Sequence, residues 1–225
     1  MKIMQPAVDY RQLRPRLLNT DQFKHIKLLI FWPIFGILFT YVERFHPVDK
    51  YHPIYSPLDD YIPFLEIFVI PYMFWFIFLI GMLIFTGLYD IVCFEKMMKF
   101  IIITYTIALI TYFVYPNCQL LRPIAFERDN FLTRFMAGFY KFDTHTNVCP
   151  SIHVIGSLAV MFAAWHGKYF RSIAWKISFG IVAVLISVST VFLKQHSIID
   201  IFAALIVCAF AYYYCFLRPK VKDIK

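Results

Sequence analysis

Six long apolar segments restrict how this chain can fold more than any other feature. They run over residues 26–43, 62–88, 99–115, 152–167, 173–193 and 198–217. Most approach the roughly 20 residues that a helix needs to cross the hydrocarbon core of a bilayer, and the fourth is the shortest. Because 60% of the residues are hydrophobic, the pattern predicts an all-α integral membrane bundle of six transmembrane helices.

A single membrane domain accounts for the whole chain of 225 residues. Its first 25 residues contain several basic side chains but neither an apolar core nor a small-residue cleavage site, so we do not expect a signal peptide. The longest stretch between apolar segments is residues 116–151. We therefore expect an N-terminal segment over 1–25, the bundle, and one large loop over 116–151.

Lysines and arginines are divided unevenly between the two sides of these segments. If the N-terminus lies inside, 15 of the 22 fall on the inner side. This excess predicts a multi-pass protein of the cell membrane with both termini cytoplasmic and with loop 116–151, His153 and His196 on the outer face. The net charge of +8 does not indicate a nucleic-acid partner, because the basic residues form no stripe.

His196 and Asp200 are ionisable residues beside an apolar segment, which makes them candidates for function. Their spacing of four places them on one face of a helix. A carboxylate in that position would hold the imidazole in one tautomer and leave the other ring nitrogen as a nucleophile or base. The pair alone is equally compatible with a structural contact between helices.

Pro150, Ser151 and His153 stand at the start of the fourth apolar segment. Ser151 is typical of a helix N-cap, and the free N–H groups of a first helical turn bind anions. His153 would lie close enough to protonate a leaving oxygen. Arg122, which is followed by Pro123, would approach from the same side and suits bidentate contact with phosphate oxygens. An ordinary cap and an ordinary interfacial arginine are the structural alternatives.

In order and spacing, these residues resemble the type-2 phosphatidate phosphatase superfamily of membrane lipid phosphatases and phosphotransferases. Its first motif ends in Arg-Pro, its second is Pro-Ser-Gly-His, and its third is Ser-Arg, five residues, His, three residues, Asp. The matching positions here are Arg122-Pro123, then Pro150-Ser151-x-His153, then Ser189 with His196 and Asp200. The resemblance covers most of the chain and implies a six-helix membrane enzyme.

The resemblance also implies a two-step reaction that needs neither a metal ion nor another cofactor. His196, oriented by Asp200, would attack phosphorus and form a phosphohistidine. His153 would protonate the departing alcohol and then activate water or another acceptor. Arg122, Ser151 and backbone N–H groups would stabilise the phosphate oxygens. A lipid phosphatase acting on a phosphomonoester or pyrophosphate is the leading expectation, with the lipid phosphate substrate and membrane lipids as its partners.

Three positions depart from the family pattern. Tyr115 replaces the lysine of the first motif, Thr190 the arginine of the third, and Ile152 the glycine of the second. Two cations are thus missing, and Lys194, two residues before His196, is a candidate to replace one. Fewer cations suit a monoanionic phosphodiester, so a head-group phosphotransferase, similar to sphingomyelin or inositol phosphorylceramide synthases, is the first alternative.

Other interpretations remain open. His145 could join His153, His196 and Asp200 in a metal site, although no HExxH pattern or carboxylate cluster supports it. A non-enzymatic transporter or scaffold is the second alternative, although the chain lacks the paired helix interruptions typical of transporters.

Two features outside the motifs also carry expectations. Cys118 and Cys149 flank the outer loop and could form a disulfide. Asp59 and Asp60 lie in a segment that we expect to be a solvated loop on the membrane. In a sharper interpretation, one of them meets a cationic head group or pairs with Arg122.

Overall fold

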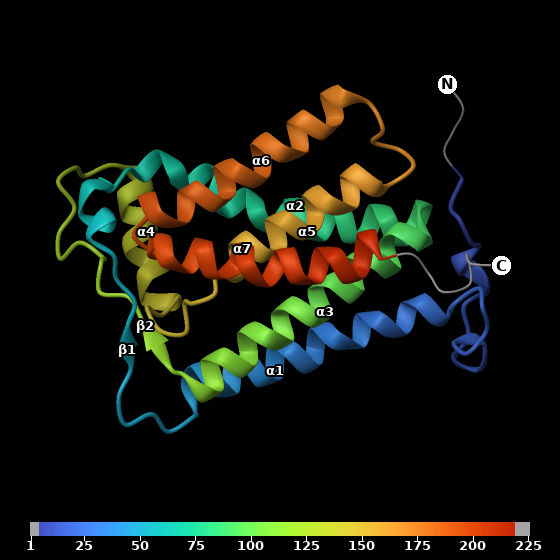
Figure 1. The fold of residues 1–225 in the computed structure, drawn as a ribbon, viewed down its shortest axis with the longest axis horizontal. Helices are drawn as coiled ribbons and strands as arrows, with labels where there is room; N and C mark the ends of the chain where they lie inside the picture. Colours follow the sequence, from blue (N-terminus) through green and yellow to red (C-terminus); the bar gives the residue numbers. More distant parts are fainter. Residues whose placement is uncertain (1–4, 219–225) are drawn as a thin grey trace.

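The computed structural model describes residues 5–218, and apolar helices make up most of it (Figure 1). The helices that lie along the long axis of the molecule are α1 (Phe31–Arg44), α2 (Val69–Tyr89), α3 (Ile91–Val114), α5 (Ile152–His166), α6 (Ile173–Phe192) and α7 (Ile198–Tyr212). Successive members of this set run in opposite directions. The start of α1 and the end of α7 therefore lie at the same end of the bundle, which we call the terminal end (Figure 1).

Within residues 5–218, five helical stretches are long and apolar enough to cross a membrane. They are Lys24–Arg44, Glu66–Tyr89, Ile91–Val114, Ile173–Phe192 and Ile198–Leu217. Helix α5 is apolar but has only 15 residues, which span about 22 Å. The described residues thus form an all-α fold with five candidate membrane spans, which is typical of a membrane protein. Lys2 and the three lysines after Arg218, which contributed to the charge count, lie outside the described residues.

Helix α5 lies at the centre of the bundle, where it contacts α2, α3, α6 and α7. Ten of its 15 residues are buried, and several are small, which lets the neighbouring helices approach closely. A Cβ atom on Gly156 would lie 2.8 Å from Nε1 of Trp75 on α2 and 2.9 Å from the hydroxyl of Tyr105 on α3. A glycine is therefore required where these three helices meet.

Two boundaries and one helix differ from the sequence-based expectations. Helix α3 begins at Ile91 rather than at 99, because the Asp90 side chain caps it by accepting from the Cys93 N–H. Helix α2 begins at Val69, preceded by a single 3-10 turn over Glu66–Phe68, instead of at 62. The expected loop 116–151 contains an additional helix, α4 (Phe131–Phe142), which Asn130 and Thr133 start with a capping box.

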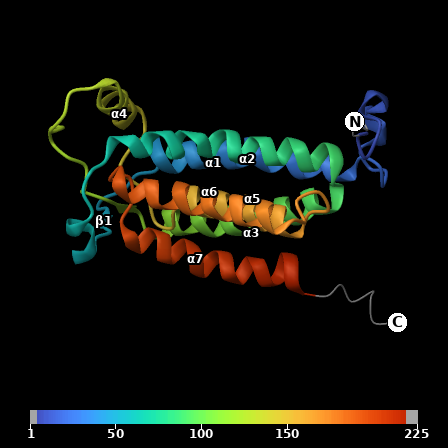
Figure 2. The ribbon, with the colours of Figure 1, turned by 90° about the horizontal axis from the view of Figure 1, so that it is seen from above.

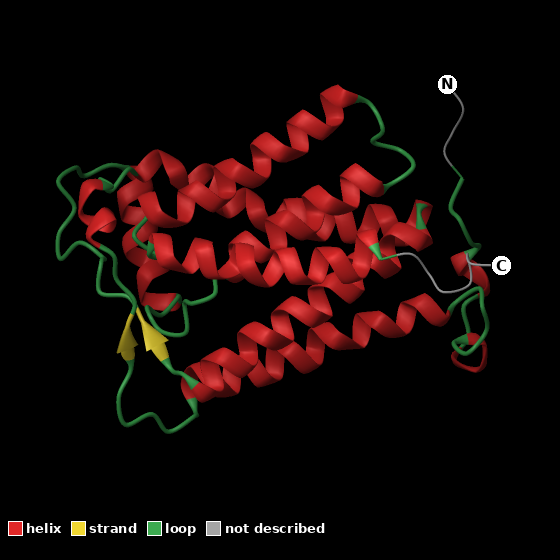
Figure 3. Cartoon of the chain, viewed as in Figure 1, coloured by secondary structure: helices red, strands yellow, loops and turns green. Residues whose placement is uncertain are grey.

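Opposite the terminal end, loops from three parts of the chain meet at what we call the loop end. Strand β1 (His52–Pro53) pairs in parallel with β2 (Asn117–Cys118), with His52 opposite Asn117 (Figure 3). Helix α4 lies at the same end, displaced from the bundle axis (Figure 2). Its exposed face carries Phe131 and Phe142, whereas Met136 is buried. The short sheet and α4 thereby cover the end at which α5 and α7 begin.

Candidate active site

The spacing of His196 and Asp200 predicted that both lie on a helix. In the structure, His196 instead lies in the tight turn between α6 and α7. Ser197 caps α7, so the helix starts only at Ile198. The Nδ1 atom of His196 is nevertheless 3.0 Å from Oδ2 of Asp200, and the same oxygen accepts from the Ser197 N–H at 3.0 Å. With its proton on Nδ1, the imidazole keeps a lone pair on Nε2.

His153 occupies the first turn of α5, after the N-cap Ser151, whose hydroxyl accepts from the Val154 N–H as expected. The His153 ring stacks on Tyr72, with a centroid distance of 4.4 Å, and lies 4.5 Å from the Trp75 ring. Its centroid is 5.8 Å from that of His196. Two histidines separated by 43 positions in the sequence thus lie side by side at the loop end.

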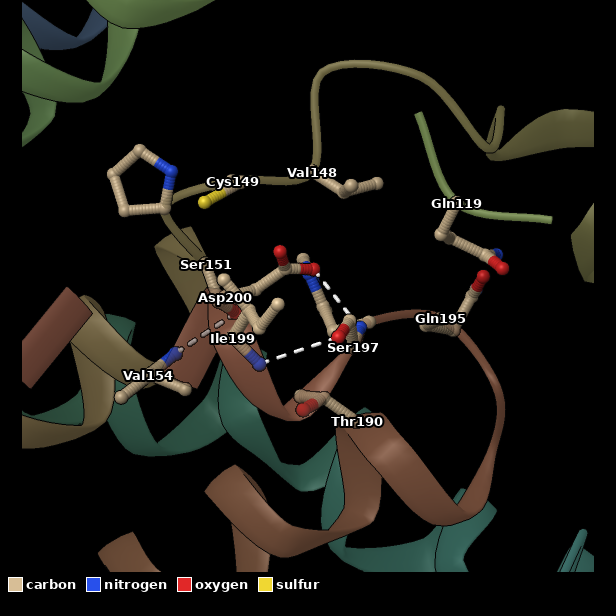
Figure 4. A network of polar contacts seen from close by, with 12 residues as sticks. Gln119, Val148, Cys149, Ser151, Val154, Thr190, Gln195, Ser197, Ile199 and Asp200 are labelled. Atoms are coloured by element: carbon tan, nitrogen blue, oxygen red, sulfur yellow. Dashed lines mark hydrogen bonds and ion pairs between the residues drawn. The ribbon is translucent and has the colours of Figure 1, made fainter. Parts of the chain in front are cut away.

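A backbone contact joins the two helix starts. The Ser151 N–H donates to the carbonyl of Asp200 at 3.3 Å. Figure 4 shows Asp200 close to both Ser151 and Ser197, with Cys149 nearby. The structure therefore brings together four of the expected residues: His153, His196, Asp200 and Ser151.

A small cavity of about 40 Å³ adjoins both histidines. Its lining includes the carboxylates of Glu43 on α1 and Asp143 after α4, and also Asn147, whose Oδ1 is buried without a partner among the described residues. Burial raises the pKa of Asp143, while the charges of Arg122 and His196 oppose this rise. None of the described residues that line the cavity is a lysine or arginine.

Arg122 lies near this cavity, but its donors are engaged elsewhere. One terminal nitrogen donates to the carbonyls of Tyr140 and Asp143, at 3.1 and 2.8 Å. The other donates to the carbonyl of Thr144, at 2.6 Å, and to Oε1 of Gln195. Only Nε has no partner in the described part of the chain. In this conformation Arg122 fastens the end of α4 to the turn that carries His196.

Lys194 also points away from the cavity. Its backbone is left-handed, with φ of 52°, and its Nζ donates to the carbonyl of Asp59 at 2.7 Å. Burial lowers the pKa of this ammonium, whereas the carboxylates of Asp59 and Asp60 oppose that effect. Lys194 was a candidate for binding the phosphate. In the structure, it contacts the loop between α1 and α2 instead.

Asp59 is buried, which contradicts its assignment to a solvated loop or to a head-group contact. Its carboxylate accepts from the Ser197 hydroxyl at 2.6 Å, from the Ile198 N–H at 2.9 Å and from the Ser56 N–H at 2.8 Å. It thus caps the N-terminus of α7 from a distant part of the chain. Asp60, in contrast, is exposed and accepts from the Tyr55 hydroxyl.

Asn117 and Gln195 are two further residues that sequence analysis missed. The Asn117 side chain accepts from the N–H groups of Val148 and Cys149 and donates to the carbonyl of Cys149. These hydrogen bonds fix the backbone of the loop segment that leads to Ser151. Gln195 donates to Asp143 at 3.0 Å. Gln195 could have been found from the sequence because it directly precedes His196. No sequence pattern pointed to Asn117.

The remaining candidates of loop 116–151 do not form sites. Cys118 and Cys149 are free thiols, so the disulfide that the sequence would have allowed is not present. Burial, together with the nearby Asp200 carboxylate, raises the pKa of Cys149 to about 12. His145 is exposed, and within residues 5–218 no group of three or more histidine, cysteine or acidic side chains is arranged to hold a metal ion.

Comparisons with protein-family models, with curated proteins and with solved structures gave no match. The residues of the loop end therefore carry the available information about function. Their arrangement offers an oriented imidazole, a second imidazole beside it, and the first turn of α5, of which Ile152 and His153 line the same cavity. These are the parts of a nucleophile with an accompanying acid–base group.

Proposed function

We propose that this chain is a membrane lipid phosphatase that resembles the type-2 phosphatidate phosphatases and hydrolyses a lipid phosphomonoester or pyrophosphate. The observation that carries the proposal is the His196–Asp200 pair with His153 beside it. The ring centroids of the two histidines are 5.8 Å apart, and both line one cavity. A nucleophile held by a carboxylate next to a second base is the arrangement that a two-step transfer requires.

In the first step, Nε2 of His196 attacks phosphorus, and the bond between phosphorus and the lipid oxygen breaks. The negative charge of the bound phosphate favours a proton on His153. That proton passes to the lipid oxygen, and the lipid alcohol leaves. In the second step, neutral His153 takes a proton from water, whose oxygen attacks the phosphohistidine. Inorganic phosphate leaves, and both histidines return to their initial protonation states. The free N–H groups at the start of α5 are suited to stabilise the phosphate oxygens.

The size of the cavity supports water as the acceptor. A water molecule requires about 10–15 Å³ of such volume, and the cavity has about 40 Å³. This space accommodates a water molecule beside the histidines. Hydrolysis is therefore our leading reaction.

The charge of the cavity favours a second candidate, transfer of a head group between phosphodiester lipids. Glu43 and Asp143 line the cavity, while Arg122 and Lys194 donate elsewhere. A dianionic monoester would be repelled more strongly by these carboxylates than a monoanionic diester would be. The carboxylates in the cavity lining therefore favour a phosphotransferase as the second candidate function.

We further propose that α5 is a sixth crossing and that the loop end faces the outside of the cell membrane. Helix α5 runs between the two ends of the bundle like its neighbours (Figure 1). The excess of Lys and Arg at the terminal end, with Lys96, Lys99, Lys168, Arg171 and Lys176 among the described residues, supports a cytoplasmic location for that end.

The decisive experiment offers labelled lipids to purified protein in detergent that contains a chelator. The panel comprises phosphatidate, phosphatidylglycerol phosphate, a polyprenyl pyrophosphate and a phosphodiester lipid with a second lipid alcohol. Release of inorganic phosphate supports hydrolysis, and a new labelled lipid supports transfer. Absence of both products, or full activity in His196→Ala, contradicts the proposal. Loss of activity caused by the chelator would instead favour a metal site.

A further inference from the structure

A second hollow lies at the terminal end, far from the histidines. It has a volume of about 740 Å³ and lies between the first turns of α3 and the C-terminal turn Tyr213–Leu217 that continues α7. We call it the basic groove. Three cations line it, Lys96, Lys99 and Arg218, together with one carboxylate, Glu95. The volume lies in the range of sites that bind small molecules.

The cations of the basic groove have no carboxylate partner among residues 5–218. No salt bridge involves Lys96, Lys99 or Arg218 in this part of the chain. Lys96 and Arg218 instead lie over aromatic rings, 6.0 Å from the centroid of Phe216 and 5.6 Å from that of Tyr214. With three cations and one carboxylate in its lining, the groove thus presents a net positive charge.

From Glu95 onward, charged side chains of α3 precede apolar ones along the groove. Ile102 and Ile103 follow the lysines on α3 and line the same hollow. Position 103 lies about 10 Å deeper along the helix than Lys96. A ligand with a negative head group and a hydrocarbon chain matches this order, because its charge would meet the cations while its chain lies on the isoleucines.

We propose that the basic groove binds one anionic phospholipid. Basic pockets between membrane helices are suited to anionic head groups. The groove lies at the opposite end of α3 from the histidines. Between Lys99 in the groove and Tyr112 at the histidine cavity, α3 rises about 20 Å. A head group held by the cations therefore does not reach the histidines, and this lipid is not the substrate of the site described above. Residues 219–225 are a poor alternative occupant, since they carry three lysines and one aspartate and thus the same sign of charge as the groove.

The test measures the thermal midpoint of the purified full-length chain in neutral detergent, with phosphatidylglycerol or with phosphatidylcholine of the same acyl chains. We expect phosphatidylglycerol alone to raise the midpoint and to remain bound in native mass spectrometry. Each removed cation should weaken the binding of phosphatidylglycerol about fivefold. In Lys96→Gln/Lys99→Gln, the affinity should therefore fall about 30-fold. The matched control Arg171→Gln/Lys176→Gln removes two charges at the same end but outside the groove, and should behave like the unaltered chain.

Three results would overturn the proposal: equal stabilisation by the two lipids, an unchanged response in the Lys96/Lys99 variant, or a response that appears only after residues 219–225 are removed. The midpoint in phosphatidylcholine reports whether the double variant is folded. If that variant cannot be purified, Arg218→Gln carries the same expectation, with a decrease of up to about tenfold in affinity. Lys96→Arg/Lys99→Arg should restore the binding, since it restores the charge.

Discussion

At the scale of single residues, the Asp200 carboxylate both orients the His196 imidazole and caps the start of α7. Oδ2 accepts from His196 Nδ1 and from the Ser197 N–H, while Oδ1 is buried without a partner in the described structure. An asparagine can keep its oxygen at the position of Oδ2 and place its amide nitrogen at the position of Oδ1. The substitution therefore removes the charge and largely preserves the geometry.

For Asp200→Asn we expect phosphate release to fall about 10²- to 10⁴-fold, because the imidazolium formed in the reaction loses its carboxylate partner. The thermal midpoint should change little. Phosphate release from the preferred lipid and the midpoint are measured on the same preparation, with His196→Ala as the inactive reference. Activity within a factor of two of the unaltered chain would show that Asp200 is only a structural cap.

Asp59 stabilises the same turn from the opposite side. In Asp59→Asn, one acceptor oxygen becomes an NH₂ group that faces the donors of Ser197, Ile198 or Ser56. We expect the free energy of unfolding to fall by about 1–3 kcal/mol, together with a loss of activity. Thermal unfolding in detergent and phosphate release measure the two effects. Asp60→Asn, on the exposed neighbour, is the matched control and should be silent; equal behaviour of the two variants would contradict the capping role.

At the scale of secondary-structure elements, the contact of α5 with α2 and α3 determines where His153 lies. Gly156 is one turn after His153, and the side chain of Trp75 on α2 packs against both residues. A side chain at position 156 displaces Trp75, and with it the ring against which His153 packs.

For Gly156→Ala we expect a destabilisation of about 1–3 kcal/mol, typical of overpacking, and a lower kcat. The matched control is Gly81→Ala on α2, where an added Cβ meets nothing within 4 Å. That control should be neutral or slightly stabilising, because alanine has the higher helix propensity. Thermal midpoints and kinetics of the two variants are compared. If Gly156→Ala were as harmless as Gly81→Ala, the three helices would not be as closely packed as described.

At the scale of the whole molecule, the two ends of the bundle should lie on opposite sides of the membrane. We expect a cysteine introduced as Asp129→Cys, in the exposed loop before α4, to react with an impermeant maleimide added to intact cells. Ser172→Cys, exposed at the terminal end, should react only after the cells are opened. The chain without an added cysteine gives the background. The reverse pattern of labelling would invert the proposed topology.

Sequence patterns predicted the local features of this fold and missed the distant ones. The segment 152–167 corresponds to α5, and the spacing of His196 and Asp200 gave a pair within hydrogen-bond distance. Helix α4 was missed because its 12 amphipathic residues are interrupted by Arg134 and Lys141 within a polar loop. The position of Asp59 depends on a partner 138 positions away, and no local pattern encodes such a contact.

The same limit applies to the phosphate-binding residues. Arg122 was assigned to phosphate because of its type and position, yet its acceptors are three carbonyls 18 to 22 positions away and Gln195, 73 positions away. Residue type predicts that an arginine will find acceptors; the tertiary fold determines which ones. Glu43 and Asp143 illustrate the converse, since neither belongs to a motif and both line the cavity.

The packing of Trp75 against His153 gives the site an optical signal of its own. The chain has four tryptophans, and the ring of Trp75 lies 4.5 Å from that of His153. A protonated imidazole quenches indole fluorescence at contact distance, whereas a neutral one quenches it much less. A ligand that changes the protonation of His153 therefore changes the emission of Trp75. We therefore expect tryptophan emission to report the binding of the proposed lipid phosphate without a label, and Trp75→Phe to lack this response.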